Sequence, residues 1–151
     1  MTLNGRTIFP GYANGEALVS RMGISFYGGV DPDTGVITEA GHDLEGLSIS
    51  GKILVFPSGK GSTVGSYILY RLKQNSHAPA AIINAECETI TAVGCIIAEI
   101  PCVDQIDLTQ IEPGMQVVRR VAIMTMMIMG VTRDLTCMRK IPLLIANSHQ
   151  D

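Results

Sequence analysis

The segment Pro57–Ser66, with the sequence PSGKGSTVGS, has the residue types best suited to chemistry. Its glycines let backbone N–H groups approach an anion closely, and a helix that follows would add partial positive charge. We therefore predict that this loop binds a carboxylate or phosphate, and that Ser62 is the candidate catalytic hydroxyl. A plain turn with a helix N-cap fits the residues equally well. The candidate binding residues of the loop are Lys60, Gly61, Thr63 and Ser66.

Two familiar catalytic motifs do not match this loop. A phosphate-binding P-loop requires G-x-x-x-x-G-K-[ST], whereas Lys60 precedes Gly61 here. There is no G-x-S-x-G elbow, and neither His77 nor His149 stands where it would serve Ser62 as a base. A serine hydrolase is therefore not indicated.

A second glycine-rich segment, Ser25–Gly35, offers Gly29 and Asp31 as candidate binding residues. Paired glycines permit close backbone approach, and Asp31 would either orient a substrate group or cap the turn that Asp31–Gly35 predicts. His42 lies in a polar stretch, which is typical of a solvent-exposed histidine.

The spacing of apolar residues predicts alternating strands and helices in the middle of the chain. We expect strands at Lys52–Phe56, at Ala80–Asn84 and around Cys102-Val103. The first predicted helix runs from Thr63 to Asn75-Ser76, with Ser62 or Thr63 as N-cap and an apolar face formed by Ile68, Leu69 and Leu72. The second follows Glu86 and Glu88 and has the predicted apolar face Ile90, Val93, Ile97 and Ile100. This alternation predicts a parallel sheet with right-handed crossovers.

The remaining segments predict a second layer of strands. The stretch Thr7–Val30 alternates short apolar runs with glycines, and Pro113-Gly114 leads into an extended Gln116–Val121. The residues after about Val118 carry no recognisable motif. We therefore divide the chain into a domain of residues 1–121 and a C-terminal extension, 122–151, of uncertain role.

The composition restricts the function classes. A chain of 151 residues that is 46% apolar is the size of one globular domain. A net charge of −3 with 5% aromatic residues does not favour nucleic-acid binding. The start of the chain does not resemble a signal peptide, and Val121–Val131 is about half of the ~20 apolar residues of a membrane span. We expect a cytoplasmic protein without a membrane segment.

The four cysteines form no C-x-x-C pair, so no metal site is expected in this chain, and buried reduced thiols are the favoured interpretation. They are Cys87, Cys95, Cys102 and Cys137.

Three motifs, in this order and spacing, resemble the small subunit of aconitase X proteins. They are GGVDPDTG at 28–35, GKILVFPSGKGSTVGS at 51–66 and APAAII at 78–83, and the resemblance runs from about Gly5 to about Val118. It implies an α/β fold: an aconitase-like swivelling β/β/α domain, with a parallel βαβ core and an additional β layer.

The resemblance also implies a function. Such a domain closes over a large catalytic subunit that holds a [4Fe-4S] cluster, and the serine at the position of Ser62 accepts a proton. The implied reaction removes water from (R)-5-phosphomevalonate to give trans-anhydromevalonate 5-phosphate, a step of an archaeal-type mevalonate pathway to isoprenoids. Two alternatives stay open: a cis-3-hydroxy-L-proline dehydratase small subunit, and a non-catalytic anion-binding module.

Overall fold

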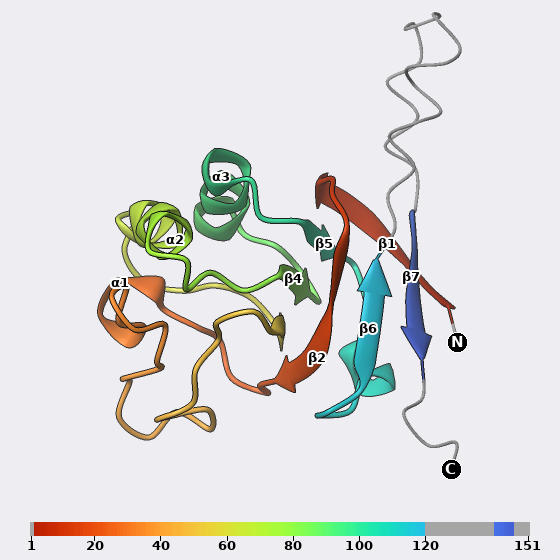
Figure 1. Ribbon diagram of the computed structural model, residues 1–151, viewed down its shortest axis with the longest axis horizontal. Coiled ribbons are helices and arrows are strands. Elements are labelled where there is room, and N and C mark those ends of the chain that lie inside the picture. Colours follow the sequence, from red (N-terminus) through yellow and green to blue (C-terminus); the bar gives the residue numbers. More distant parts are fainter. Residues whose placement is uncertain (1, 120–140, 147–151) are drawn as a thin grey trace, which may run out of the picture.

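The computed structural model describes residues 2–119 and 141–146 and shows a curled sheet with helices on one side (Figure 1). The seven strands in this part of the chain close into a barrel in the order β1-β5-β4-β3-β2-β6-β7. They are β1 (Thr2–Phe9), β2 (Ala13–Val19), β3 (Ile53–Phe56), β4 (Ala81–Asn84), β5 (Cys102–Asp104), β6 (Gln116–Arg119) and β7 (Ile141–Ala146).

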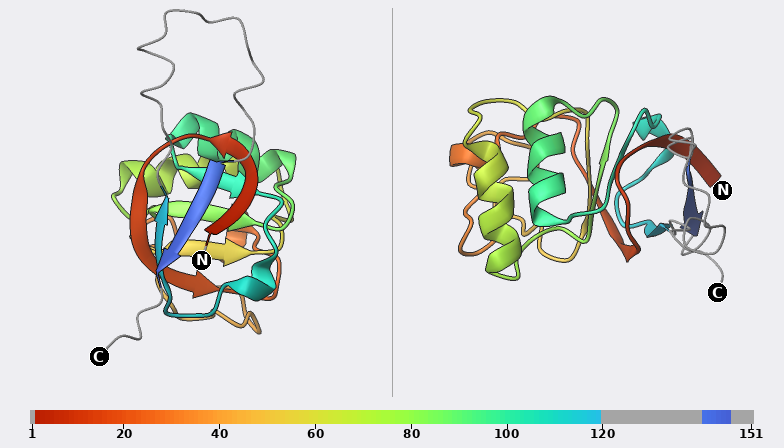
Figure 2. Two further views of the ribbon diagram at one scale, coloured as in Figure 1. Left: turned by 90° about the vertical axis from the view of Figure 1, so that its right-hand side faces the viewer. Right: turned by 90° about the horizontal axis from the view of Figure 1, so that it is seen from above.

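The predicted parallel core is confirmed. β2 pairs with β3, β3 with β4 and β4 with β5, all in parallel. Helices α2 (Gly65–Gln74) and α3 (Thr89–Ala98) make the crossovers and lie side by side on one face of these strands (Figure 2). The predicted β layer is formed by β1, β6 and β7, whose pairings are antiparallel.

The strands divide the core in two because successive side chains point to opposite faces. In β3, Leu54 and Phe56 join the cluster under the helices, whereas Ile53 and Val55 join the cluster inside the barrel. All four residues are fully buried. The apolar run that predicted this strand is therefore explained by burial on both faces.

The helices differ in how well their buried faces were predicted. In α2, Ile68, Leu69 and Leu72 are buried as expected. In α3 the prediction is wrong for two of the four predicted residues, because Val93 and Ile97 are 42% and 48% exposed. The buried face consists of Thr91, Gly94, Cys95 and Ala98.

Close helix packing explains the difference in α3. A Cβ at Gly94 would overlap Leu69 and lie 3.2 Å from the Cα of Ser66. Small residues therefore face α2, and larger apolar side chains of α3 point outward. Ile100 is buried, but it follows Glu99, whose left-handed conformation ends the helix.

The chain between β2 and β3, residues 20–52, contains little regular structure but is well packed. The segment labelled α1 (Phe26–Gly29) is a tight turn, because Tyr27 is extended and Gly28 has a φ of +82°. The predicted turn at Asp31–Gly35 is present: the Gly35 N–H donates to the Asp31 carbonyl at 2.8 Å. Six apolar residues of this segment are buried: Ile24, Phe26, Val30, Ile37, Leu44 and Ile49.

β7 pairs with both β1 and β6, so residues 141–146 of the predicted C-terminal extension supply a strand of the barrel. The Met-rich stretch and Cys137 lie outside the described residues. In the part of the chain that is described, no helix is long and apolar enough to cross a membrane.

Candidate active site

The loop Pro57–Val64 is fixed on two sides before it reaches α2. Its first carbonyl, that of Pro57, accepts hydrogen bonds from the N–H groups of Ala85 and Glu86, both at 3.1 Å. Further along, the Ile24 N–H donates to the Ser58 carbonyl at 3.3 Å, and the Lys60 N–H donates to the Ile24 carbonyl at 3.0 Å. The loop is therefore held between the β4–α3 connection and the irregular segment, residues 20–52.

Two glycines allow this close approach. A Cβ at Gly59 would overlap the Glu88 carboxylate and the Thr91 hydroxyl, and one at Gly61 would overlap the Ser25 hydroxyl. Gly61 also has a φ of +88°, a left-handed conformation that favours glycine. The glycine spacing of the sequence thus corresponds to real contacts on both sides of the loop.

Three successive backbone N–H groups remain available at the end of this loop. Those of Gly61, Ser62 and Thr63 make no hydrogen bond to any described residue. All three residues are exposed, and the next residues begin α2. Unpaired N–H groups before a helix attract negative charge, so this loop has the features of an anion site.

At the start of α3, by contrast, backbone N–H groups are already bonded to a carboxylate. Glu88 is the N-cap of α3, and its carboxylate accepts the N–H groups of Ile90 at 2.6 Å and Thr91 at 2.8 Å. α2 has no acidic residue in its first turn and no side-chain cap bond. Of these two helices, only α2 begins without a carboxylate of its own.

The predicted N-cap of α2 is wrong by one or two positions. Val64, not Ser62 or Thr63, is the N-cap. The Ser62 hydroxyl oxygen instead accepts the N–H of Val64 at 3.2 Å, while the Ser62 carbonyl accepts the N–H of Gly65 at 2.9 Å. Ser62 therefore precedes the helix and its hydroxyl is exposed to solvent.

A shallow pocket of about 230 Å³ lies beside this loop. It is lined by Ser25, Tyr27, Gly28, Gly29 and Glu39. Lys60 reaches its edge, because the Lys60 ammonium lies 2.9 Å from the Glu39 carboxylate. The structure thus brings Lys60, Gly61 and Gly29 into one region, and adds Glu39, which the sequence did not single out.

Two other candidates make bonds elsewhere. The Ser66 hydroxyl donates to the Ile90 carbonyl at 2.7 Å and so connects α2 to α3. The Asp31 carboxylate accepts the Asp33 N–H at 2.9 Å, as in the turn-capping alternative.

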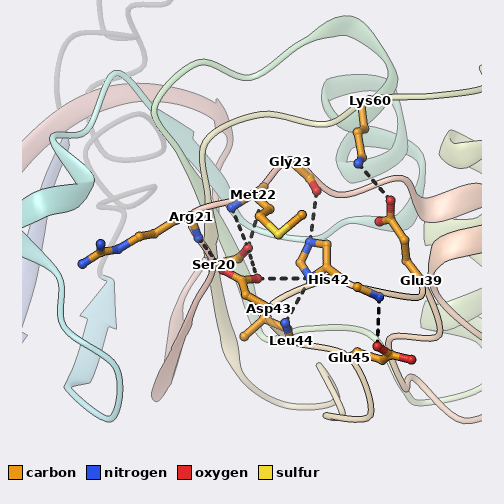
Figure 3. A network of polar contacts seen from close by, with 11 residues as sticks. Ser20, Arg21, Met22, Gly23, Glu39, His42, Asp43, Leu44, Glu45 and Lys60 are labelled. Atoms are coloured by element: carbon orange, nitrogen blue, oxygen red, sulfur yellow. Dashed lines mark hydrogen bonds and ion pairs between the residues drawn. The ribbon is translucent and has the colours of Figure 1, made fainter.

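His42, expected to be exposed, is buried, and this prediction is wrong. Its Nδ1 accepts the Leu44 N–H at 3.1 Å, so Nε2 carries the proton and donates to the Gly23 carbonyl at 3.0 Å (Figure 3). Both ring nitrogens are used, which gives His42 a bracing role between two loops. A buried histidine among polar neighbours cannot be distinguished from an exposed one by composition.

Asp43 strengthens the same bracing. Burial raises the pKa of its carboxyl, but hydrogen bonds from the Ser20 hydroxyl at 2.6 Å and the Arg21 N–H at 2.9 Å outweigh this, so the pKa is lowered overall. The ionised form is therefore favoured in the folded chain.

The three cysteines in the described part of the chain, Cys87, Cys95 and Cys102, provide no nucleophile near this site. Cys87 is half-buried, and its hydrogen bond with Cys102, followed by burial, raises the pKa of its thiol well above the usual range. A thiol held protonated is a poor nucleophile. Among residues 2–119 and 141–146, no three His, Cys, Asp or Glu side chains are placed to hold a metal ion.

The fold and the loop together define a swivel domain of the aconitase type. A family model described as the aconitase X swivel domain matches residues 2–127, and the chain belongs to this family.

Named relatives agree with this assignment. The phosphomevalonate dehydratase small subunit of Thermococcus kodakarensis is 58% identical over 117 residues, which cover 78% of this chain and 88% of that protein. The protein of the same name from Methanosarcina acetivorans is 60% identical over 110 residues, covering 73% and 76%. The crystal structure of Thermococcus kodakaraensis aconitase X in its holo form matches with a TM-score of 0.77 and 57% identity, covering 78% and 90%. The names of these relatives imply a larger partner subunit.

Proposed function

We propose that this chain is the small subunit of a heteromeric hydro-lyase that dehydrates (R)-5-phosphomevalonate to trans-anhydromevalonate 5-phosphate. Relatives at 58% and 60% identity bear the name of that enzyme's small subunit. The structural observation that carries the proposal is the exposed Ser62 hydroxyl beside three unpaired N–H groups and Lys60. The pathway is an archaeal-type mevalonate route, and the enzyme acts in the cytoplasm.

Ser62 is the proton acceptor in this proposal. Its oxygen, as the alkoxide, takes a proton from the carbon next to the one that bears the hydroxyl, and the C–H electrons form the new double bond. The C–O electrons leave with the hydroxyl as hydroxide, which a proton converts to water. The Val64 N–H, which donates to the Ser62 oxygen, and the start of α2 favour negative charge on that oxygen. These groups make a hydroxyl a better base than it is in water.

The anionic ends of the substrate are bound by the same loop. Lys60 and the N–H groups of Gly61 to Thr63 are arranged to bind a carboxylate or a phosphate. Gly29 forms part of the pocket wall, where a backbone without a side chain leaves room for the substrate. Asp31 caps its own turn and Ser66 connects α2 to α3, so both act as structural supports of the site.

The second half of the active site belongs to the large subunit. Its [4Fe-4S] cluster would supply Lewis-acid activation of the leaving hydroxyl. In this chain, residues 1–121 form the swivelling domain, and β7, which lies within the predicted extension 122–151, completes its barrel. The exposed face of the Pro57–Val64 loop is the part that turns to the partner.

The test mixes this chain with its large subunit, loaded anaerobically with the cluster, and follows loss of (R)-5-phosphomevalonate. We expect turnover only with both chains, and a fall of about 10²–10⁴-fold in kcat for Ser62→Ala, the range for loss of a general base. Ser50→Ala is the matched control, because Ser50 lies in the turn before β3 and its hydroxyl makes no hydrogen bond to a described residue.

Four results would contradict the proposal. Turnover of the large subunit alone would remove the need for this chain. Full turnover with Ser62→Ala would remove Ser62 as the proton acceptor. Turnover of cis-3-hydroxy-L-proline instead of the phosphorylated substrate would favour the alternative dehydratase, and binding of anions without turnover would favour the non-catalytic module.

A further inference from the structure

Glu39 is the one acidic side chain among the residues that line the pocket. Its Oε1 lies 2.9 Å from the Lys60 Nζ, and Figure 3 shows the two side chains pointing toward each other. The Glu39 side chain is 30% exposed and that of Lys60 is 47% exposed. The pair is therefore reached by solvent and by small molecules, unlike a core ion pair.

The backbone that carries Glu39 is held firmly. The Thr38 N–H donates to the carbonyl of Gly29 at 3.0 Å, which joins the Glu39 loop to the pocket wall. The Glu39 carbonyl accepts the His42 N–H at 3.2 Å, and the buried His42 ring is bonded at both nitrogens. The carboxylate thus projects from a braced loop.

Lys60 needs such a partner. Its backbone is fixed by the bond to Ile24, but its ammonium sits at the end of four rotatable carbon–carbon bonds and takes many positions in water. A carboxylate at hydrogen-bond distance reduces these positions to those beside the pocket. Holding a charged group in place before binding lowers the entropy cost of binding an anion.

We propose that Glu39 is a positioning residue that holds the Lys60 ammonium at the pocket edge for an anionic group of the substrate. The inference rests on the proposed function, since it assumes that Lys60 binds a carboxylate or phosphate. Glu39 acts through Lys60 and takes no part in the proton transfer. Glu39 thus fixes where the positive charge that Lys60 contributes to the loop is held.

The test is a double-mutant cycle in the reconstituted two-subunit enzyme. Glu39→Ala raises KM for (R)-5-phosphomevalonate by about tenfold, corresponding to one charge-assisted hydrogen bond, and leaves kcat within about twofold. Lys60→Ala raises KM at least as much. The double variant is no worse than Lys60→Ala, because Glu39 has nothing left to position. Glu39→Gln keeps a side-chain oxygen acceptor and recovers part of the loss.

Glu16→Ala is the matched control. Glu16 forms a similar ion pair with Lys52 at 3.3 Å, and neither residue lines the pocket. We expect no change in KM for this variant. Thermal midpoints of Glu39→Ala and Glu16→Ala should agree, which separates positioning from a general loss of stability.

Inorganic phosphate as a competitive inhibitor identifies the anion. Its inhibition constant rises with Glu39→Ala and Lys60→Ala if the pair serves the phosphate end, and stays constant if it serves the carboxylate end. Either result agrees with the inference, provided that KM rises in both variants.

Three outcomes would overturn the inference: an unchanged KM in Glu39→Ala, additive effects in the double variant, or a large loss of kcat without a change in KM. The last would make Glu39 a group that acts on the reacting atoms. Ser62→Ala is measured in the same assay. Full turnover by that variant would reject Ser62 as the proton acceptor, and this result is separate from the KM values that test the role of Glu39.

Discussion

Two regions meet at the candidate site and are built in different ways. Residues 53–104 form parallel strands and two helices, whereas residues 20–52 have only isolated bridges such as Val30 with Ile37 and Val36 with Ser48. Burial is nevertheless similar: Ile37 and Ile49 are as inaccessible to solvent as Leu54. A segment without regular structure thus contributes fully to the core.

The difference lies in how backbone polar groups are satisfied. In the regular region the strand ladders and helices use them, whereas the irregular region depends on turns and on side chains such as Ser20, His42 and Asp43. Hydrogen bonds of these side chains also join parts of the irregular region that lie about twenty residues apart in the sequence. The pocket lies along this region, next to the loop that the regular region supplies.

The largest expected effect tests whether the irregular region is part of the same core. Phe26 is buried and packs edge-to-face on Phe56 of β3, with ring centroids 5.9 Å apart. Phe26→Ala should lower the free energy of unfolding by about 3–5 kcal/mol, as expected for a buried ring. Leu69→Ala, in α2, is the matched core change and should cost about 2–5 kcal/mol.

Urea unfolding of the purified chain measures both values. A loss below about 1 kcal/mol for Phe26→Ala, with the full loss for Leu69→Ala, would mean that the irregular region is only loosely attached.

The sequence predicted the regular region better for a physical reason. Strands such as Ile53–Phe56 and helix α2 are specified by local patterns of apolar residues, which can be read directly. The face of α3 was missed because it depends on contact with α2, where Gly94 meets Leu69. β7 was missed because its pairing with β1 joins the two ends of the chain.

Only part of the site was predicted from the sequence, and the reason is again that local patterns can be read directly whereas long-range contacts cannot. The glycine spacing identified Gly61 and Ser62, and Lys60 stood beside them. Glu39 lies about twenty residues earlier and joins them only through the fold. A local signal for His42 was absent, since its partners are the backbone groups of Gly23 and Leu44.

An intermediate effect tests the polar network of the irregular region. Ser20→Ala removes the hydroxyl that donates to Asp43 at 2.6 Å and should cost about 1 kcal/mol at pH 7, the net value of one hydrogen bond. The folded pKa of Asp43 is lowered, so this contribution is present above the unfolded pKa of about 3.9 and is lost as pH falls through the folded value.

Unfolding of wild type and Ser20→Ala is therefore compared at pH 7 and at a pH well below the unfolded pKa, about pH 2. The difference should shrink in acid, where Asp43 is protonated in both proteins. A difference that does not depend on pH would show that Ser20 acts through its bond with Met22 rather than through Asp43.

The smallest expected effect compares two ion pairs, one beside the pocket and one away from it. Lys52–Glu16 connects β2 with the residue before β3, and Lys60–Glu39 connects the loop to the irregular region. Both pairs are well exposed, so removing either carboxylate should change the free energy of unfolding by about 0–1 kcal/mol. Raised salt should reduce this contribution further. Thermal unfolding of Glu16→Ala and Glu39→Ala at low and high salt measures the contribution of each pair.

A loss of stability several times larger for Glu39→Ala would make the Lys60–Glu39 pair a structural support of the irregular region. A rise in KM would then follow from a displaced pocket wall. Equal, small losses would leave positioning of Lys60 as the reason for any change in KM, because the two pairs share their chemistry and differ in their distance from the pocket.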